Sequence, residues 1–141
     1  MKGLMTLIRL AKRDLDELKR KQTELQVQKD KLEQAIRRLH EDLLREQKLA
    51  AKMQEMAGFY GEFAKRIKAR ELEIKEEITK VDAELLKIAD DILLAFADLK
   101  KYEIALENVK ARKRAEDDRK ETIMFDDIAG QQFLKKMKED Q

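Results

Sequence analysis

Apolar residues recur at alternating intervals of four and three positions along most of this 141-residue chain, from Leu4 to Val109. Such a series averages about 3.5 residues per turn, slightly less than the natural period of about 3.6 for an α-helix. One helix face then stays against a partner helix only if the pair supercoils with a left hand. The sequence therefore predicts an all-α coiled coil. Four polar residues interrupt the series: Gln22, Lys29, Glu46 and Glu71.

The composition supports a thin helical assembly rather than a compact globule. Charged residues make up 44% of the chain, and proline is absent. The chain contains no cysteine, so it can form neither a disulfide nor a thiolate metal site. No apolar run approaches the length of about 18 residues that a membrane-spanning helix needs. We therefore expect a cytoplasmic protein.

The partner helix could lie in the same chain or in another copy. The phase of the series does not change at the middle of the chain, so one continuous helix in a parallel oligomer is an alternative. However, Gly58 and Gly61 lie where two nearly equal arms would meet. Each glycine costs a helix interior about 1 kcal/mol relative to alanine, and both suit a chain reversal. These positions favour an antiparallel hairpin.

The apolar four-and-three series forms the seam between the two helices. Charges beside this seam, and the polar residues that interrupt it, bear on the hairpin and on the position of its reversal. The stretch 71–98 holds nine acidic residues and three lysines, and the stretch 17–44, which a hairpin places beside it, has a net charge of +1. These charges would attract the two arms weakly to each other. Folding about Gly58 would set Glu46 against Glu71 in the seam, which is unfavourable for two carboxylates. Moving the reversal one heptad earlier removes that clash and sets Leu4 opposite Leu106.

The resulting division treats residues 1–141 as a single coiled-coil domain with an overhanging C-terminal helical tail. The predicted parts are a first arm over about 3–54, a turn over about 54–58, a second arm over about 59–116 and a tail over about 117–141. In the tail, Phe125, Ala129, Phe133 and Met137 recur every four residues, with Ile128 alongside. This spacing predicts an amphipathic helix that nothing in its own chain must cover.

The sequence offers little chemistry for catalysis. His40 is the only histidine, so it cannot join a second histidine or a cysteine in a metal site or a nucleophilic site. It lies just off the seam, where we expect a solvated or packing side chain. The acidic pair Asp126 and Asp127 points to different sides of a helix, and no glycine-rich loop is present to hold phosphate. We therefore expect no catalytic residue, no metal and no cofactor.

Basic residues cluster near the free end that a hairpin would have. Arg9 and Arg13 lie on the first arm, and Arg112, Lys113 and Arg114 lie on the second. Clustered lysine and arginine can bind nucleic acid, but the net charge is only +2 and acidic residues intersperse both groups. An acidic protein surface would be an alternative partner, and an ordinary solvated face is a third interpretation.

Two stretches of the chain resemble the FliJ family, the small coiled-coil component of the bacterial flagellar export apparatus. Residues 4–18 resemble the opening helix of that family. The closing basic, Leu-Asp-Glu, Ala and Phe pattern of FliJ proteins is similar to Lys113-Arg114, 119–121, 125–129 and Phe133-Leu134. Phe125 stands here for the usual leucine and Asp127 for the usual glutamate.

The resemblance implies a two-helix stalk, similar to the central stalk of rotary ATPases. Such a stalk would sit in the hexameric export ATPase, contact the export gate membrane protein and handle export chaperones, peripherally at the cytoplasmic face of the membrane. It would bind no small-molecule substrate. An injectisome stalk, a dimeric scaffold and a nucleic-acid arm remain alternatives. The residues expected to bind partners are Arg9, Arg13, Arg112, Lys113, Arg114, Phe125, Asp126, Ile128, Phe133 and Met137.

Overall fold

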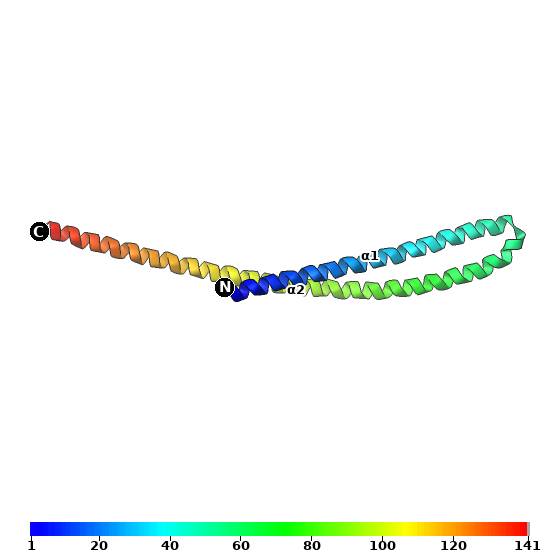
Figure 1. The fold of residues 1–141 in the computed structure, drawn as a ribbon, viewed down its shortest axis with the longest axis horizontal. Coiled ribbons are helices and arrows are strands. Elements are labelled where there is room, and N and C mark those ends of the chain that lie inside the picture. The colour runs from blue at the N-terminus through cyan, green and yellow to red at the C-terminus, as the bar shows by residue number, and fades with distance from the viewer. Residues whose placement is uncertain (141) are drawn as a thin grey trace. The chain divides into compact units, whose positions relative to one another are not determined.

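The computed structural model describes residues 1–140, which form two long helices joined by a short turn (Figure 1). Helix α1 spans Lys2–Lys52, the 3₁₀ turn η1 spans Gln54–Met56, and helix α2 spans Ala57–Glu139. The described residues contain no strand. Because the chain has no proline, no residue interrupts the backbone hydrogen bonds of either helix. The predicted all-α hairpin is confirmed.

The chain divides into two compact units, which we treat separately. The hairpin unit, Arg13–Phe96, contains most of α1, the turn and the first half of α2. The terminal unit consists of Met1–Lys12 and the residues from Ala97 onward. The grouping of the chain into one domain with the parts named above stays a prediction, and residue 141 of the predicted tail lies outside the described residues.

Burial follows the predicted seam residue by residue. Every member of the four-and-three series from Leu4 to Val109 is buried or half-buried, except Met53 and Ala57 beside the turn. Ile74 in the hairpin unit is the most deeply buried, with 2% of its surface exposed. The heptad phase predicted from the sequence is therefore confirmed. The buried apolar residues of the hairpin unit are Leu15, Ile67, Ile74, Val81 and Ile88, and those of the terminal unit are Ile8 and Leu99.

The chain reverses without a glycine, so the predicted role of Gly58 and Gly61 is wrong. Met53 has an extended backbone, with φ of −127° and ψ of 111°, which any residue adopts. The N–H of Met56 donates to the carbonyl of Met53 at 3.1 Å and closes the 3₁₀ turn. Both glycines lie inside α2, no described glycine has a positive φ, and a Cβ atom at either would meet nothing within 4 Å.

Two ion pairs between the helices define the register of the hairpin unit. Lys29 Nζ lies 2.8 Å from Asp82 Oδ1, and His40 Nε2 lies 3.1 Å from Glu71 Oε1. The predicted register, which sets Leu4 opposite Leu106, pairs Lys29 with Val81, the neighbour of Asp82. The observed ion pairs therefore agree with the predicted register to within one residue.

Candidate partner-binding site

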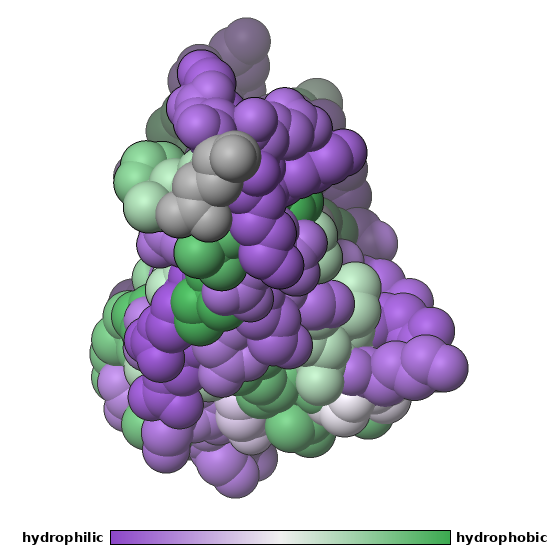
Figure 2. All heavy atoms as spheres, turned by 90° about the vertical axis from the view of Figure 1, so that its left-hand side faces the viewer, coloured by the Kyte–Doolittle hydropathy of each residue, from purple (hydrophilic) through white to green (hydrophobic). Residues whose placement is uncertain are grey.

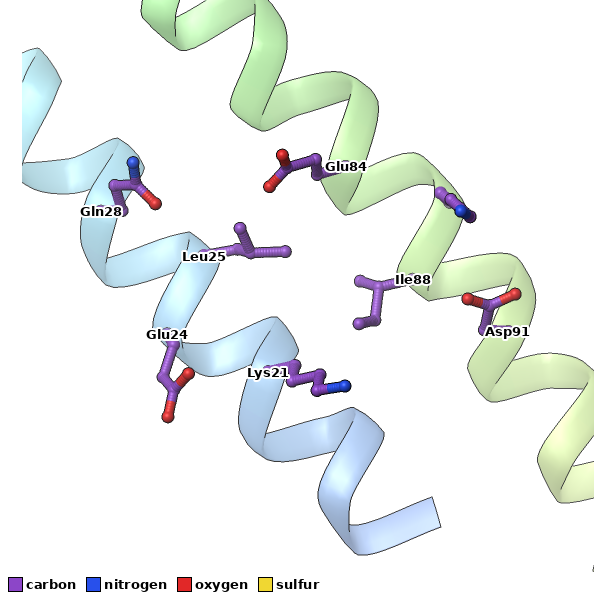
Figure 3. Close-up of a pocket in the computed structure, with 8 residues that line it drawn as sticks. Lys21, Glu24, Leu25, Gln28, Glu84, Ile88 and Asp91 are labelled. Atoms are coloured by element: carbon purple, nitrogen blue, oxygen red, sulfur yellow. The ribbon is translucent and has the colours of Figure 1, made fainter. Parts of the chain in front are cut away.

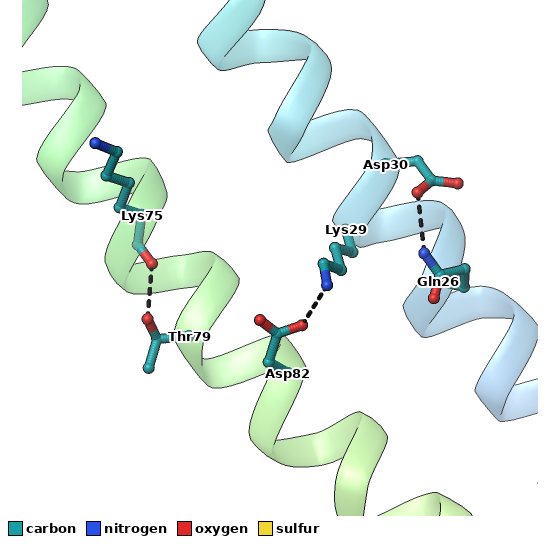
Figure 4. Close-up of polar contacts among 6 residues, drawn as sticks. All are labelled: Gln26, Lys29, Asp30, Lys75, Thr79 and Asp82. Carbon is teal, nitrogen blue, oxygen red and sulfur yellow. Dashed lines mark hydrogen bonds and ion pairs between the residues drawn. The ribbon is translucent and has the colours of Figure 1, made fainter.

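Two of the four polar interruptions of the seam, Lys29 and Glu71, have polar partners on the opposite helix or the same helix. Lys29 is half-buried at a seam position and reaches across to Asp82, as Figure 4 shows. The hydrogen bond and charge of Asp82 raise the pKa of Lys29 above its usual value. A lysine in this seam therefore stays charged and binds the second arm at a fixed position.

Glu71 accepts hydrogen bonds from two side chains, one on each helix. Lys75 Nζ, one turn further along α2, and His40 Nε2, on α1, both lie 3.1 Å from Glu71 Oε1. These contacts, with Lys75 as the larger cause and His40 as the next, lower the pKa of the Glu71 carboxyl. The histidine side chain is 55% exposed, so it is a surface partner of a half-buried seam carboxylate.

The pKa of Glu71 leads to a prediction about pH. Because folding lowers this pKa, the contribution of Glu71 to stability is present above the unfolded value of about 4.3 and is lost as pH falls through the lower folded value. We expect Glu71→Gln to lower the melting temperature at neutral pH but to match the wild type near pH 2. Circular dichroism melts at both pH values test this expectation. Glu77→Gln is the control, because Glu77 is exposed and forms no salt bridge with a described residue; an equal effect there would contradict the assignment.

The groove between the helices is lined by apolar seam residues with charged residues at its edges. Leu25 of α1 and Ile88 of α2 point toward each other across it, and Lys21, Glu84 and Asp91 line its edges (Figure 3). No polar or charged side chain of the described residues is buried, and none of their acidic or histidine side chains gather in a group that could hold a metal ion. The groove is therefore the packed seam of the coiled coil seen from outside.

No helix within residues 1–140 has the length and apolarity to cross a membrane.

The predicted tail residues lie in a part of α2 that nothing covers. All residues from Lys110 to Asp140 are exposed, which follows from the end of the seam at Val109. Phe125 is 68% exposed and Phe133 is 64% exposed. Figure 2, viewed from the side of Figure 1 on which the C-terminus lies, shows hydrophobic residues among hydrophilic ones at the surface. The other predicted tail residues, Asp126, Ile128 and Met137, are exposed as well.

Three further apolar residues of the tail are exposed, although the four-residue spacing did not predict them. They are Ile123, Met124 and Leu134. Ile123 and Met124 directly precede Phe125, and Leu134 directly follows Phe133. In the sequence they can be recognised as neighbours of other apolar residues, but not by a regular spacing. The apolar surface of the tail is therefore wider than one stripe.

The predicted basic residues are exposed but do not all belong to one unit. Arg9, Arg112, Lys113 and Arg114 lie in the terminal unit, whereas Arg13 lies in the hairpin unit. Arg114 Nη2 lies 3.3 Å from Glu107 Oε1, so part of the positive charge is already paired. The terminal unit thus combines an exposed basic segment with the exposed apolar tail that follows it.

Comparison with known proteins identifies a family. The model of a family described as "Flagellar FliJ protein" matches residues 1–138 of the chain. Comparisons with curated proteins and with solved structures found no match. The family match covers both helices and the turn, as well as nearly all of the exposed tail.

Proposed function

Because this chain belongs to the FliJ family of flagellar export apparatus proteins, we propose that it is a non-enzymatic stalk bound inside the hexameric export ATPase ring. In this role it couples the ATPase to the export gate membrane protein and to export chaperones. It works at the cytoplasmic face of the membrane. The coupling needs a stiff shaft with binding surfaces, and it needs no catalytic group of its own.

The observation that carries this proposal is the uncovered tail of α2. Residues 110–140 are exposed along their whole length, and they include two phenylalanines that are about two-thirds exposed. Exposed apolar clusters of this kind usually mark a surface for a partner, and aromatic residues most often dominate the binding energy of an interface. We assign the tail as the main docking segment for the ATPase, with Phe125, Ile128, Phe133 and Met137 as anchors and Asp126 as a polar contact.

The basic residues support the same assignment through electrostatics. Arg112 and Lys113 are exposed and form no salt bridge with a described residue, and they lie directly between the seam and the tail. Exposed cations accelerate association with an acidic surface and orient the encounter, while they add little to final affinity. We propose that they guide the stalk into the ring before the apolar tail docks, and that Arg9, Arg13 and Arg114 assist.

Co-purification with the ATPase tests this function. We expect the full chain, mixed with the hexameric export ATPase of the same source, to elute with the hexamer in size-exclusion chromatography and to give one chain per hexamer in native mass spectrometry. An unrelated antiparallel coiled coil of similar length is the control and should elute separately. Separate elution of this chain at physiological salt would refute the proposed ring binding.

A further inference from the structure

A second set of leucines lies on α2 outside the seam. Leu86 is 73% exposed, Leu93 is 68% exposed and Leu94 is 67% exposed. Leu86 and Leu93 are seven residues apart, and each directly follows a seam residue, Leu85 and Ile92. All belong to the hairpin unit. We call these three exposed side chains the leucine stripe. Leu86 and Leu93 repeat with the heptad period of the seam, Leu94 lies next to Leu93, and none of the three is a seam residue.

The stretch 15–31 of α1 carries no leucine at the equivalent outward positions, although Leu44 further along α1 directly follows the seam residue Leu43 and is 51% exposed. On α1, the residues one and two positions after the seam residues Leu15, Gln22 and Lys29 are all polar or charged. They are Asp16, Glu17, Thr23, Glu24, Asp30 and Lys31. A solvated coiled-coil face normally looks like this stretch of α1. An outward leucine pair in heptad spacing is therefore a feature that the hairpin itself does not require.

The surroundings of the stripe are acidic. The segment Glu71–Phe96 contains eight acidic residues and three lysines, which gives a net charge of −5. Glu71, Glu73 and Asp82 form salt bridges. The other five form none with a described residue: Glu76, Glu77, Glu84, Asp90 and Asp91.

We propose that the leucine stripe docks an amphipathic helix of another protein, with apolar residues in heptad spacing and lysine or arginine beside them. The seven-residue spacing favours a helix that supercoils along α2, because only such a helix meets Leu86 and Leu93 in register. The acidic surroundings select basic flanks. They also disfavour a second copy of this stripe, since two segments of net charge −5 would repel each other. This interaction is independent of the proposed docking of the tail.

A designed peptide tests the charge and spacing of the partner. The probe is a fluorescent helical peptide of three heptads with leucine at both core positions and lysine at the flanking positions; its match carries glutamate in place of lysine. We expect the full chain to bind the lysine peptide at least about 10-fold more tightly, with a difference that shrinks at high salt. The methyl resonances of Leu86, Leu93 and Leu94 should shift on binding. Equal affinity for both peptides, or no binding of the lysine peptide, would overturn the proposal.

Matched variants locate the site. We expect Leu86→Gln with Leu93→Gln to weaken binding of the lysine peptide at least about 10-fold. The control is Val27→Gln with Leu44→Gln, which alters two exposed apolar residues of α1 and should leave binding unchanged. Equal effects of the two pairs would overturn the assignment of the site. Analytical ultracentrifugation of the wild type gives a second check, because a dimer that the stripe variant dissociates would name a second copy as the occupant and refute the proposal.

Discussion

Ile74→Asp is expected to unfold most of the hairpin unit. Ile74 has 2% of its surface exposed and lies in the middle of the seam of α2. The substitution removes a packed aliphatic side chain, at a cost of about 2–5 kcal/mol, and places a carboxylate in the packed seam. The sum is a large fraction of the total stability of about 5–15 kcal/mol that a domain has. Loss of helicity and of the thermal transition in circular dichroism at neutral pH measures the effect.

Leu72→Asp is the matched control for this prediction. Leu72 lies two residues earlier on the same helix, but 60% of its surface is exposed. The same chemical change at that position should alter stability by about 0.5 kcal/mol or less. Similar destabilisation by both substitutions would mean that the heptad phase of α2 is not the one described here.

The seam was predictable because its signal is local. Whether a residue faces the partner helix depends on the pitch of its own helix, so spacing alone identified positions such as Ile8, Ile74 and Leu99 as buried. The two exceptions, Met53 and Ala57, lie where the helices end and the period no longer applies.

The reversal and the polar contacts were less predictable, because they depend on the approach of two distant segments. An extended Met53 and one 3₁₀ turn suffice for the reversal, and nothing in these residue types distinguishes them from helix formers. The pairing of His40 with Glu71 likewise requires the register between the arms, and a shift of one heptad would separate the two residues. The sequence alone identified Glu71 as a polar interruption of the apolar series, but it did not identify Lys75 and His40 as its partners.

The candidate site was predicted only in part. The exposure of the tail follows from the end of the seam, but the width of its apolar surface does not. The end of the seam at Val109 predicted that Phe125 and Phe133 are uncovered. A search for one periodic stripe passed over Ile123 and Leu134, as it passed over Leu86 and Leu93 beside the seam. The periodic spacing of apolar residues identifies one face of a helix, whereas a binding surface can lie on a different face.

Truncation after Arg114 is expected to abolish most binding to the ATPase ring while leaving the hairpin intact. All residues beyond Arg114 within the described part are exposed, and the seam ends at Val109, so the deleted segment covers no buried side chain. We expect the melting temperature to stay within a few degrees of the full chain. An aromatic anchor contributes about 2 kcal/mol or more to a typical interface, so loss of the tail should weaken ring binding at least about 30-fold. Thermal melts and a binding titration with the hexameric ATPase measure the two effects.

A pair of point variants separates the role of the anchors from the length of the tail. Phe125→Ala with Phe133→Ala should weaken ring binding in the same direction as the truncation, with unchanged melting, because both side chains are already about two-thirds exposed. Gln131→Ala with Gln132→Ala is the control, since these exposed residues lie in the same segment and should leave binding unchanged. If the truncated chain melts much earlier than the full chain, the tail packs against the hairpin and has a structural role. If both stability and ring binding survive truncation, the tail is not the docking segment, and Arg112 and Lys113 become the residues to replace next.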